Sequence, residues 1–352
     1  YQVSPYLARR FGGLGTAQIG YSYQEARIEG RNIALPGGAQ FATDDQRVVA
    51  HQLFSTLRSG EDFGRLALEQ RTIATTYEGD TVLAGARRFI TVLQAGYALT
   101  RQLTVLGDIG YESQRYRGTR PFTIRGPIWS IGLRWSPSQG SSITVRYGRR
   151  DGFASFGFDS GVDLGPSTRL TASYLERVAS PLQGGLDLLS GSSVDQAGSL
   201  VSNTTGQQVI TPFGSPVLAT QDSLFRTRRA VVTLARTWPR DVVTLSLFRD
   251  ERTPLTSSPG VFAIDQSGYF GALAWTRALR PDLSGVATVQ YGRTRSGSAP
   301  SANFYAARVG LSQELSRGLF VTGQYQIRVS EGGFGTGDAV QNTVLVGLRQ
   351  AF

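Results

Sequence analysis

The chain contains no cysteine, no methionine and no lysine, and its only histidine is His51. Without cysteine there can be no disulfide framework, no thiolate metal site and no cysteine nucleophile. All 36 basic residues are arginines, so every positive side chain is a guanidinium that stays ionised and can bind a carboxylate or phosphate through two hydrogen bonds. The absence of an initiating methionine leads us to expect a processed chain, with any signal peptide upstream.

The absence of cysteine and the single histidine also argue against an enzyme. A Ser-His-Asp site would have to use His51, which lies in the strand-like run 46–58 with no signature around it. Neither a calcium-loop pattern nor a metal cluster occurs, and a glycine-rich phosphate loop would need a strand-to-helix setting that is missing, so we expect no metal and no cofactor. The net charge is +10, but the arginines are spread along the whole chain, and we expect no nucleic-acid partner.

The sequence also has no apolar run long enough for a transmembrane helix. Instead, apolar and polar residues alternate along its whole length. In residues 319–329 one face reads Leu-Val-Gly-Tyr-Ile-Val and the other reads Phe-Thr-Gln-Gln-Arg. This two-residue period is typical of a half-buried strand. The same period recurs in residues 16–24, 103–112, 127–135, 142–150 and 283–291.

Such strands occur in soluble sandwiches and in membrane barrels, and three features favour the barrel. The polar faces are rich in Gly, Ser, Thr, Gln and Arg, which suits a water-filled lumen. Aromatic residues such as Trp129, Trp135 and Tyr147 lie toward the ends of apolar faces, where interfacial girdles form. Short connections alternate with longer ones, as short periplasmic turns alternate with extracellular loops.

We therefore predict an all-β fold, a transmembrane antiparallel up-and-down β-barrel of about 16–18 strands, with residues 1–352 forming one domain in the bacterial outer membrane. About seventeen strands can be counted, and since such barrels have even numbers we expect a further strand upstream. The last strand carries an apolar stripe and a terminal aromatic, which resembles the signal read by the barrel assembly machinery. Gln350 stands where a second aromatic is usual. The candidate signal residues are Val344, Val346, Leu348 and Phe352.

The alternation also predicts which charged side chains line the lumen. An excess of arginine there would favour anionic solutes, because low-dielectric walls focus the potential. Pairing between arginines and acids on neighbouring strands would instead only stiffen the wall. The predicted lumen residues are Arg88, Arg134, Arg146, Arg150, Arg308, Arg328, Arg349, Asp108, Glu112 and Glu314.

Residues 180–222 interrupt the strand pattern with a long segment that is rich in Leu, Gly, Ser and Gln. A connection of this length is usually functional or disordered. We predict an extracellular loop that folds into the barrel as a constriction or plug. The alternatives are a mobile surface loop or an unrecognised hairpin.

The central stretch adds a resemblance. Residues 126–152 read GPIWSIGLRWSPSQGSSITVRYGRRDG, and a strand with Ser173, Tyr174 and Glu176 follows before the long segment. From residue 126 to the C-terminus the chain resembles outer-membrane β-barrels encoded with exopolysaccharide and exosortase (PEP-CTERM) systems. The resemblance implies a link to export or assembly of surface polysaccharide, and it brings no catalytic residues.

Three functions follow as hypotheses. The first is a passage for an extracellular, anionic polysaccharide, or a part in its assembly. The second is a general anion-preferring porin, and the third is a closed barrel that anchors partner proteins at the surface. The expected partners are outer-membrane lipid and lipopolysaccharide, the barrel assembly machinery, and, for the first hypothesis, the polysaccharide and periplasmic export proteins.

Overall fold

The computed structural model describes residues 2–28, 32–34, 40–42, 46–181, 183, 192–194, 200–202, 222–258, 264–297, 300–332 and 338–350. Its main feature is one antiparallel sheet of 18 strands, and two short hairpins lie apart from it. Few of the described residues are helical, and they include the 3-10 turn η1 (Glu61–Phe63). The strands of the large sheet are β1 (Gln2–Val3), β2 (Tyr6–Arg10), β3 (Gly15–Ile28), β6 (Gln46–Ser59), β7 (Leu66–Gly79), β8 (Arg87–Ala98), β9 (Leu103–Tyr116), β10 (Phe122–Ser138), β11 (Ser141–Arg150), β12 (Phe153–Gly165), β13 (Thr168–Ala179), β16 (Ser223–Thr237), β17 (Asp241–Ser257), β18 (Gln266–Arg280), β19 (Leu283–Ser296), β20 (Ala302–Ser316), β21 (Leu319–Glu331) and β22 (Ala339–Gln350). The two separate hairpins are β4 (Asn32–Ala34) with β5 (Gln40–Ala42), and β14 (Ser192–Val194) with β15 (Leu200–Ser202).

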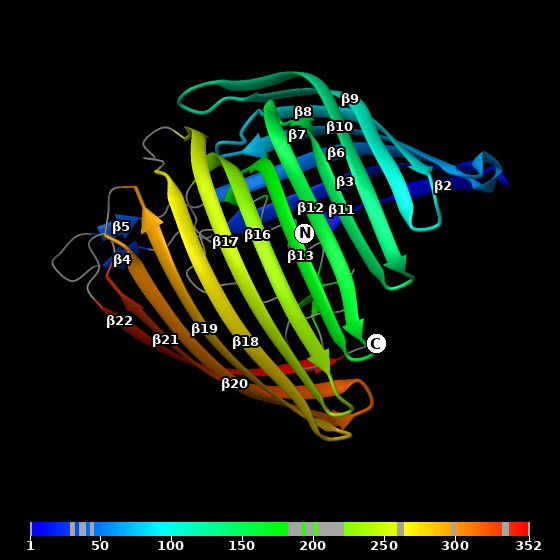
Figure 1. The fold of residues 1–352 in the computed structure, drawn as a ribbon. Coiled ribbons are helices and arrows are strands. Elements are labelled where there is room, and N and C mark those ends of the chain that lie inside the picture. Colours follow the sequence, from blue (N-terminus) through cyan, green and yellow to red (C-terminus); the bar gives the residue numbers. More distant parts are fainter. Residues whose placement is uncertain are drawn as a thin grey trace.

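Each strand of the large sheet pairs with the next one along the chain, from β3 through β6 to β22. Antiparallel neighbours need only a short turn between them, and this explains the simple up-and-down order. Figure 1 shows the strands curving from blue through green to red as a barrel wall. The predicted fold class is confirmed.

The two edges of the sheet run in the same direction. β1 and β2 continue one register on β3, with Gln2 opposite Gln24 and Tyr6 opposite Gly20, so they are two halves of one pass interrupted at Pro5. The sheet therefore makes seventeen passes from its 18 strands. An odd number leaves the first and last passes parallel, and no described strand pairs with the free edge of β2 or of β22. The expectation of an upstream strand stays a prediction.

Register and exposure separate the two faces of the wall. On β10, Trp129, Ile131 and Leu133 are all exposed, with Ile131 at 62%, and each lies opposite another outward residue of β11. An apolar surface of this extent is not stable in water, whereas it fits hydrocarbon. Trp129 and Tyr147 stack edge to face on this surface, as in an aromatic girdle. The interleaved residues face the lumen.

The connections differ between the two ends of the strands. At one end they are short, as at residues 166–167 between β12 and β13 or 317–318 between β20 and β21. At the other end most are longer, as at residues 80–86, 117–121 and 180–222, although β11 and β12 are joined there by Asp151 and Gly152 alone. By the rule for outer-membrane barrels, the end with the longer connections is extracellular. Among the helices that the structure describes, none is long and apolar enough to span a membrane.

Candidate functional site

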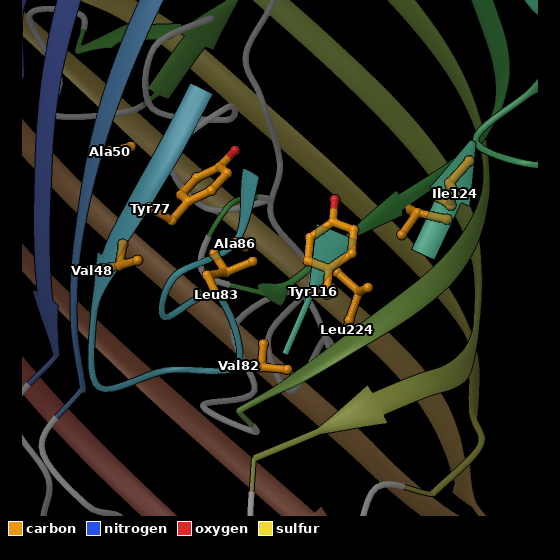
Figure 2. Packing of buried hydrophobic residues seen from close by; sticks show 10 residues of the cluster. Val48, Ala50, Tyr77, Val82, Leu83, Ala86, Tyr116, Ile124 and Leu224 are labelled. Atoms are coloured by element: carbon orange, nitrogen blue, oxygen red, sulfur yellow. The ribbon is translucent and has the colours of Figure 1, made fainter. Parts of the chain in front are cut away.

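An apolar cluster fills part of the lumen near its extracellular mouth. It includes lumen-facing residues of β6, β7, β9 and β10, together with Val82 and Leu83 from the connection between β7 and β8. Leu83 and Leu224 are fully buried and Tyr116 is 1% exposed. Figure 2 shows Val82, Leu83 and Ala86 between Tyr77 on one side and Tyr116 and Leu224 on the other. An open channel has no reason to bury apolar side chains in its lumen, so the cluster occludes this part of the mouth.

Hydrogen bonds hold the connection 80–86 in place, and we call it the occluding segment. The N–H of Tyr77 donates to the carbonyl of Ala86 (3.0 Å), and the N–H of Gly85 donates to the carbonyl of Tyr77 (2.9 Å). The N–H of Val82 donates to Oδ1 of Asp222 (2.7 Å), just before β16. Asp222 also accepts a hydrogen bond from the Ser258 hydroxyl. The segment is thereby tied to strands far from its own along the wall.

Asp222 is partly buried beneath this segment. Burial raises the pKa of its carboxyl group, and the hydrogen bonds from Ser258 and from the N–H of Val82 partly offset that rise. The residue lies outside the strands, in a connection that the sequence predicted only as a long loop.

A second bridge crosses the mouth. The N–H of Thr119, between β9 and β10, donates to the carbonyl of Ser257 at the end of β17 (2.7 Å). The Thr119 hydroxyl donates to the same carbonyl (2.8 Å). β9 and β10 are not ladder neighbours of β17, so this contact spans the opening and braces it.

A buried polar network lies beside the apolar cluster. Glu112, 1% exposed, accepts the N–H groups of Asp151 (3.0 Å) and Gly152 (2.9 Å). Asp151 in turn accepts hydrogen bonds from the Gln114 amide (2.9 Å) and from the N–H of Val178 (3.2 Å). The turn between β11 and β12 is therefore held in the lumen by two carboxylates whose oxygens are satisfied, and Glu112 has a structural role.

A cavity of about 320 Å³ opens next to the cluster. Its lining mixes apolar residues, such as Val48, Ala50 and Val178, with polar and charged ones. Three arginines reach it from three different strands. They are Arg88 of β8, Arg150 of β11 and Arg177 of β13. The sequence predicted Arg88 and Arg150 as lumen residues, but no local pattern showed that they would share one cavity.

Elsewhere in the lumen, two acids each pair with two arginines. Glu69 pairs with Arg58 and with Arg71, both at 2.8 Å. Asp250 pairs in the same way with Arg229 (3.0 Å) and Arg252 (3.7 Å). Each of these two acids is thus shared between two arginines.

The remaining sequence-predicted acids are also engaged. Asp108 pairs with Arg146 at 2.7 Å and accepts the Ser130 hydroxyl. Glu314 accepts the N–H of Gly318 (3.2 Å) and so stabilises a turn at the periplasmic end.

Several predicted arginines have no ion pair with a described residue. Arg134 makes only a long hydrogen bond to the Thr144 hydroxyl (3.4 Å), and no ion pair is found for Arg88 or Arg150 within the described residues. None of these three side chains is therefore held in a direct ion pair with a carboxylate of the described wall.

The other predicted lumen residues lie across the barrel. Arg308 is opposite Gln326, Arg328 is opposite Ala306, and Arg349 is opposite Phe320. These positions share the lumen-facing register, but they are not brought into the cavity.

The candidate assembly signal lies on the last strand. Val344, Val346 and Leu348 project from the outward face of β22 and are all more than 70% exposed. Phe352 lies outside the described residues, and so does most of the segment 180–222, so the predicted constriction by that segment stays a prediction. The occlusion that the structure does show comes from residues 80–86, which the sequence pattern did not single out.

Solved structures with a similar fold come from bacterial outer membranes. The siderophore receptor PirA from Pseudomonas aeruginosa matches with a TM-score of 0.54 at 12% identity, over 100% of this chain and 62% of its own. The ferric yersiniabactin uptake receptor FyuA from Yersinia pestis matches with a TM-score of 0.51 at 10% identity, over 99% and 62%. A loop-deletion mutant of OmpT from Vibrio cholerae matches at 0.40 and 9% identity, over 99% of both chains.

No family model matches this sequence, and no curated protein is similar to it. The chain spans about 62% of the length of each of the two receptors. At these identities the likeness shows the fold alone. Together with the apolar belt and the up-and-down ladder, it defines the class of protein: a bacterial outer-membrane β-barrel.

Proposed function

We propose that this barrel is a passage for anionic saccharide across the outer membrane, closed at its extracellular mouth by the occluding segment. The observation that carries the proposal is the set of lumen arginines that form no ion pair with a described residue, Arg88, Arg134 and Arg150. A positive lumen with low-dielectric walls concentrates anions and lowers their barrier to entry.

The saccharide part of the proposal is supported by the resemblance to barrels encoded with exopolysaccharide systems. On this hypothesis the polysaccharide and periplasmic export proteins are the partners, and the assembly machinery inserts the barrel by its last strand. The width also agrees, because a barrel of about 16–18 strands leaves an aqueous lumen unless something fills it.

Ion selectivity of the refolded barrel in planar bilayers tests the anionic part. We expect the reversal potential in a potassium chloride gradient to show a preference for chloride. Arg134→Gln and Arg150→Gln should each reduce that preference, because each removes a lumen charge that forms no ion pair with a described acid. Arg149→Gln is the matched control, since Arg149 neighbours Arg150 on β11 but lies opposite Trp129 on the outward face.

A cation-selective pore, or equal effects of the lumen and outward variants, would contradict the proposal.

A second candidate is a closed barrel that anchors partner proteins, and the buried cluster in the mouth favours it. If the barrel stays silent even when the occluding segment is replaced by glycine and serine, the anchor is the better description. Conductance that is blocked by long anionic saccharides but not by short ones separates a saccharide passage from a general anion porin.

A further inference from the structure

We infer that the cavity beside the occluding segment is a binding site for a carboxylated sugar residue, a uronic acid within a longer saccharide. This deepens the proposed function and rests on it. The cavity measures about 320 Å³, at the lower end of the range for small-molecule sites. A space of that size suits one sugar residue better than a folded oligosaccharide.

The charges around the cavity favour a carboxylate. Arg88, Arg150 and Arg177 line it, and the acids there are Asp151 and Glu176. Both oxygens of Asp151 already accept hydrogen bonds, from Gln114 and from Val178. Glu176 forms ion pairs with Arg226 and Arg228, on the neighbouring strand β16. Neither acid forms an ion pair with Arg88 or Arg150 in the described structure, and three arginines against two acids leave the cavity lining with a net positive charge.

Arg88 is the most informative of the three. Its Nε atom is buried with no hydrogen-bond partner in the part of the chain that the structure describes. A buried donor of this kind costs free energy unless something accepts from it. A carboxylate can accept two parallel hydrogen bonds from a guanidinium, which is the strongest arrangement open to this side chain.

The rest of the lining suits a sugar ring better than an inorganic anion. Gln24, Gln52 and Thr75 come from three adjacent strands and supply amide and hydroxyl groups to pair with sugar hydroxyls. Tyr77, Leu175 and Val178 also line the cavity and offer apolar surface to the carbon–hydrogen face of a ring. An inorganic anion would make no favourable contact with that apolar surface.

The site also lies against the occluding segment. Tyr77 lines the cavity, and its own backbone N–H and C=O groups hold Ala86 and Gly85 of that segment. The Gln183 amide donates to the Tyr77 hydroxyl (2.7 Å) at the edge of the same cavity. A sugar bound here touches the residue on which the segment is anchored.

Calorimetric titration of the full barrel in detergent micelles tests the inference. The probes are oligogalacturonate and a neutral galacto-oligosaccharide of equal length, and inorganic phosphate is a third. We expect the uronate to bind and the neutral sugar and phosphate to bind at least tenfold more weakly. Arg88→Gln should weaken uronate binding by about ten- to a hundredfold, because charged hydrogen bonds contribute about 1.5–3 kcal/mol and each 1.4 kcal/mol is tenfold.

Two further variants keep the test independent of folding and of selectivity. Arg150→Gln changes an exposed side chain, so the fold should be retained while uronate binding falls. Arg134→Gln removes a lumen charge outside the cavity and should leave binding unchanged while it alters ion selectivity. Equal binding of charged and neutral sugars, or unchanged binding in both cavity variants, would overturn the site even in an anion-selective pore. A cation-selective pore that still binds uronate through Arg88 would instead overturn only the proposed passage.

Discussion

At the scale of the residue, Asp151 is the most constrained position in the mouth. It is the one non-glycine residue with positive φ among those described, at +53°, and Gly152 follows at +78°. Two successive left-handed residues make the tight turn that joins antiparallel strands, and Asp tolerates that conformation better than most residues. Its side chain also satisfies Gln114 and the N–H of Val178, so the conformation and the contacts depend on one another.

We expect Asp151→Ala to lower the free energy of unfolding by about 2–4 kcal/mol, since the left-handed conformation costs about 1–2 kcal/mol without a polar side chain and two donors lose their acceptor. Asp151→Asn should cost less, because asparagine tolerates the conformation and keeps one acceptor. Guanidinium unfolding in detergent micelles measures both. Equal midpoints for the alanine variant and the parent chain would show that the turn does not depend on this side chain.

Asp222 gives the mouth a dependence on pH. Burial raises the pKa of its carboxyl group above the ordinary 3.8, so the folded state favours the protonated form. Docking of the occluding segment is then strongest at low pH and weakens as pH rises through the raised pKa, where a partly buried charge forms. We expect conductance to increase over that interval and Asp222→Asn to flatten the response. A parent barrel whose conductance falls with rising pH would contradict this sign.

At the scale of the element, the occluding segment is held mainly by Leu83 and Val82. Replacing a fully buried leucine by alanine typically costs about 2–5 kcal/mol. We therefore expect Leu83→Ala to raise the fraction of time for which the mouth is open, seen as longer conducting events in single-channel recordings. Ala84→Ser is a suitable control, because Ala84 lies in the same segment and is less buried. Identical gating of the two variants would show that the occluding segment does not control opening of the mouth.

The strands could be predicted from the sequence, whereas the occluding segment could not. Strand alternation is a local signal, so the two-residue period alone assigns Leu319 and Arg328 to opposite faces, and β21 has that register. The burial of Val82 and Leu83 depends on Asp222, which is 140 positions away from Val82. No local period encodes a contact of that range. For the same reason, no local sequence pattern predicts that Arg88 and Arg150 share a cavity, because only the fold brings their strands together.

At the scale of the whole molecule, the free edges of β2 and β22 leave backbone groups unpaired. In an antiparallel ladder both backbone groups of a residue point toward the same neighbour, so about every second amide of β22 points away from β21. We expect those amides to exchange hydrogen rapidly in detergent micelles of residues 1–352, while the amides of β20 stay protected. Uniform protection of β22 would show that another strand or molecule covers its edge.

For the described strands alone, the odd number of passes also limits how copies of the sheet can associate. Two copies inserted in the same orientation present edges that run in the same direction, so β22 of one copy could meet β2 of another only as a parallel pair. The large sheet uses no parallel ladder anywhere in its described strands. Taken alone, the seventeen described passes therefore neither close by an antiparallel pair nor favour side-by-side growth within the membrane.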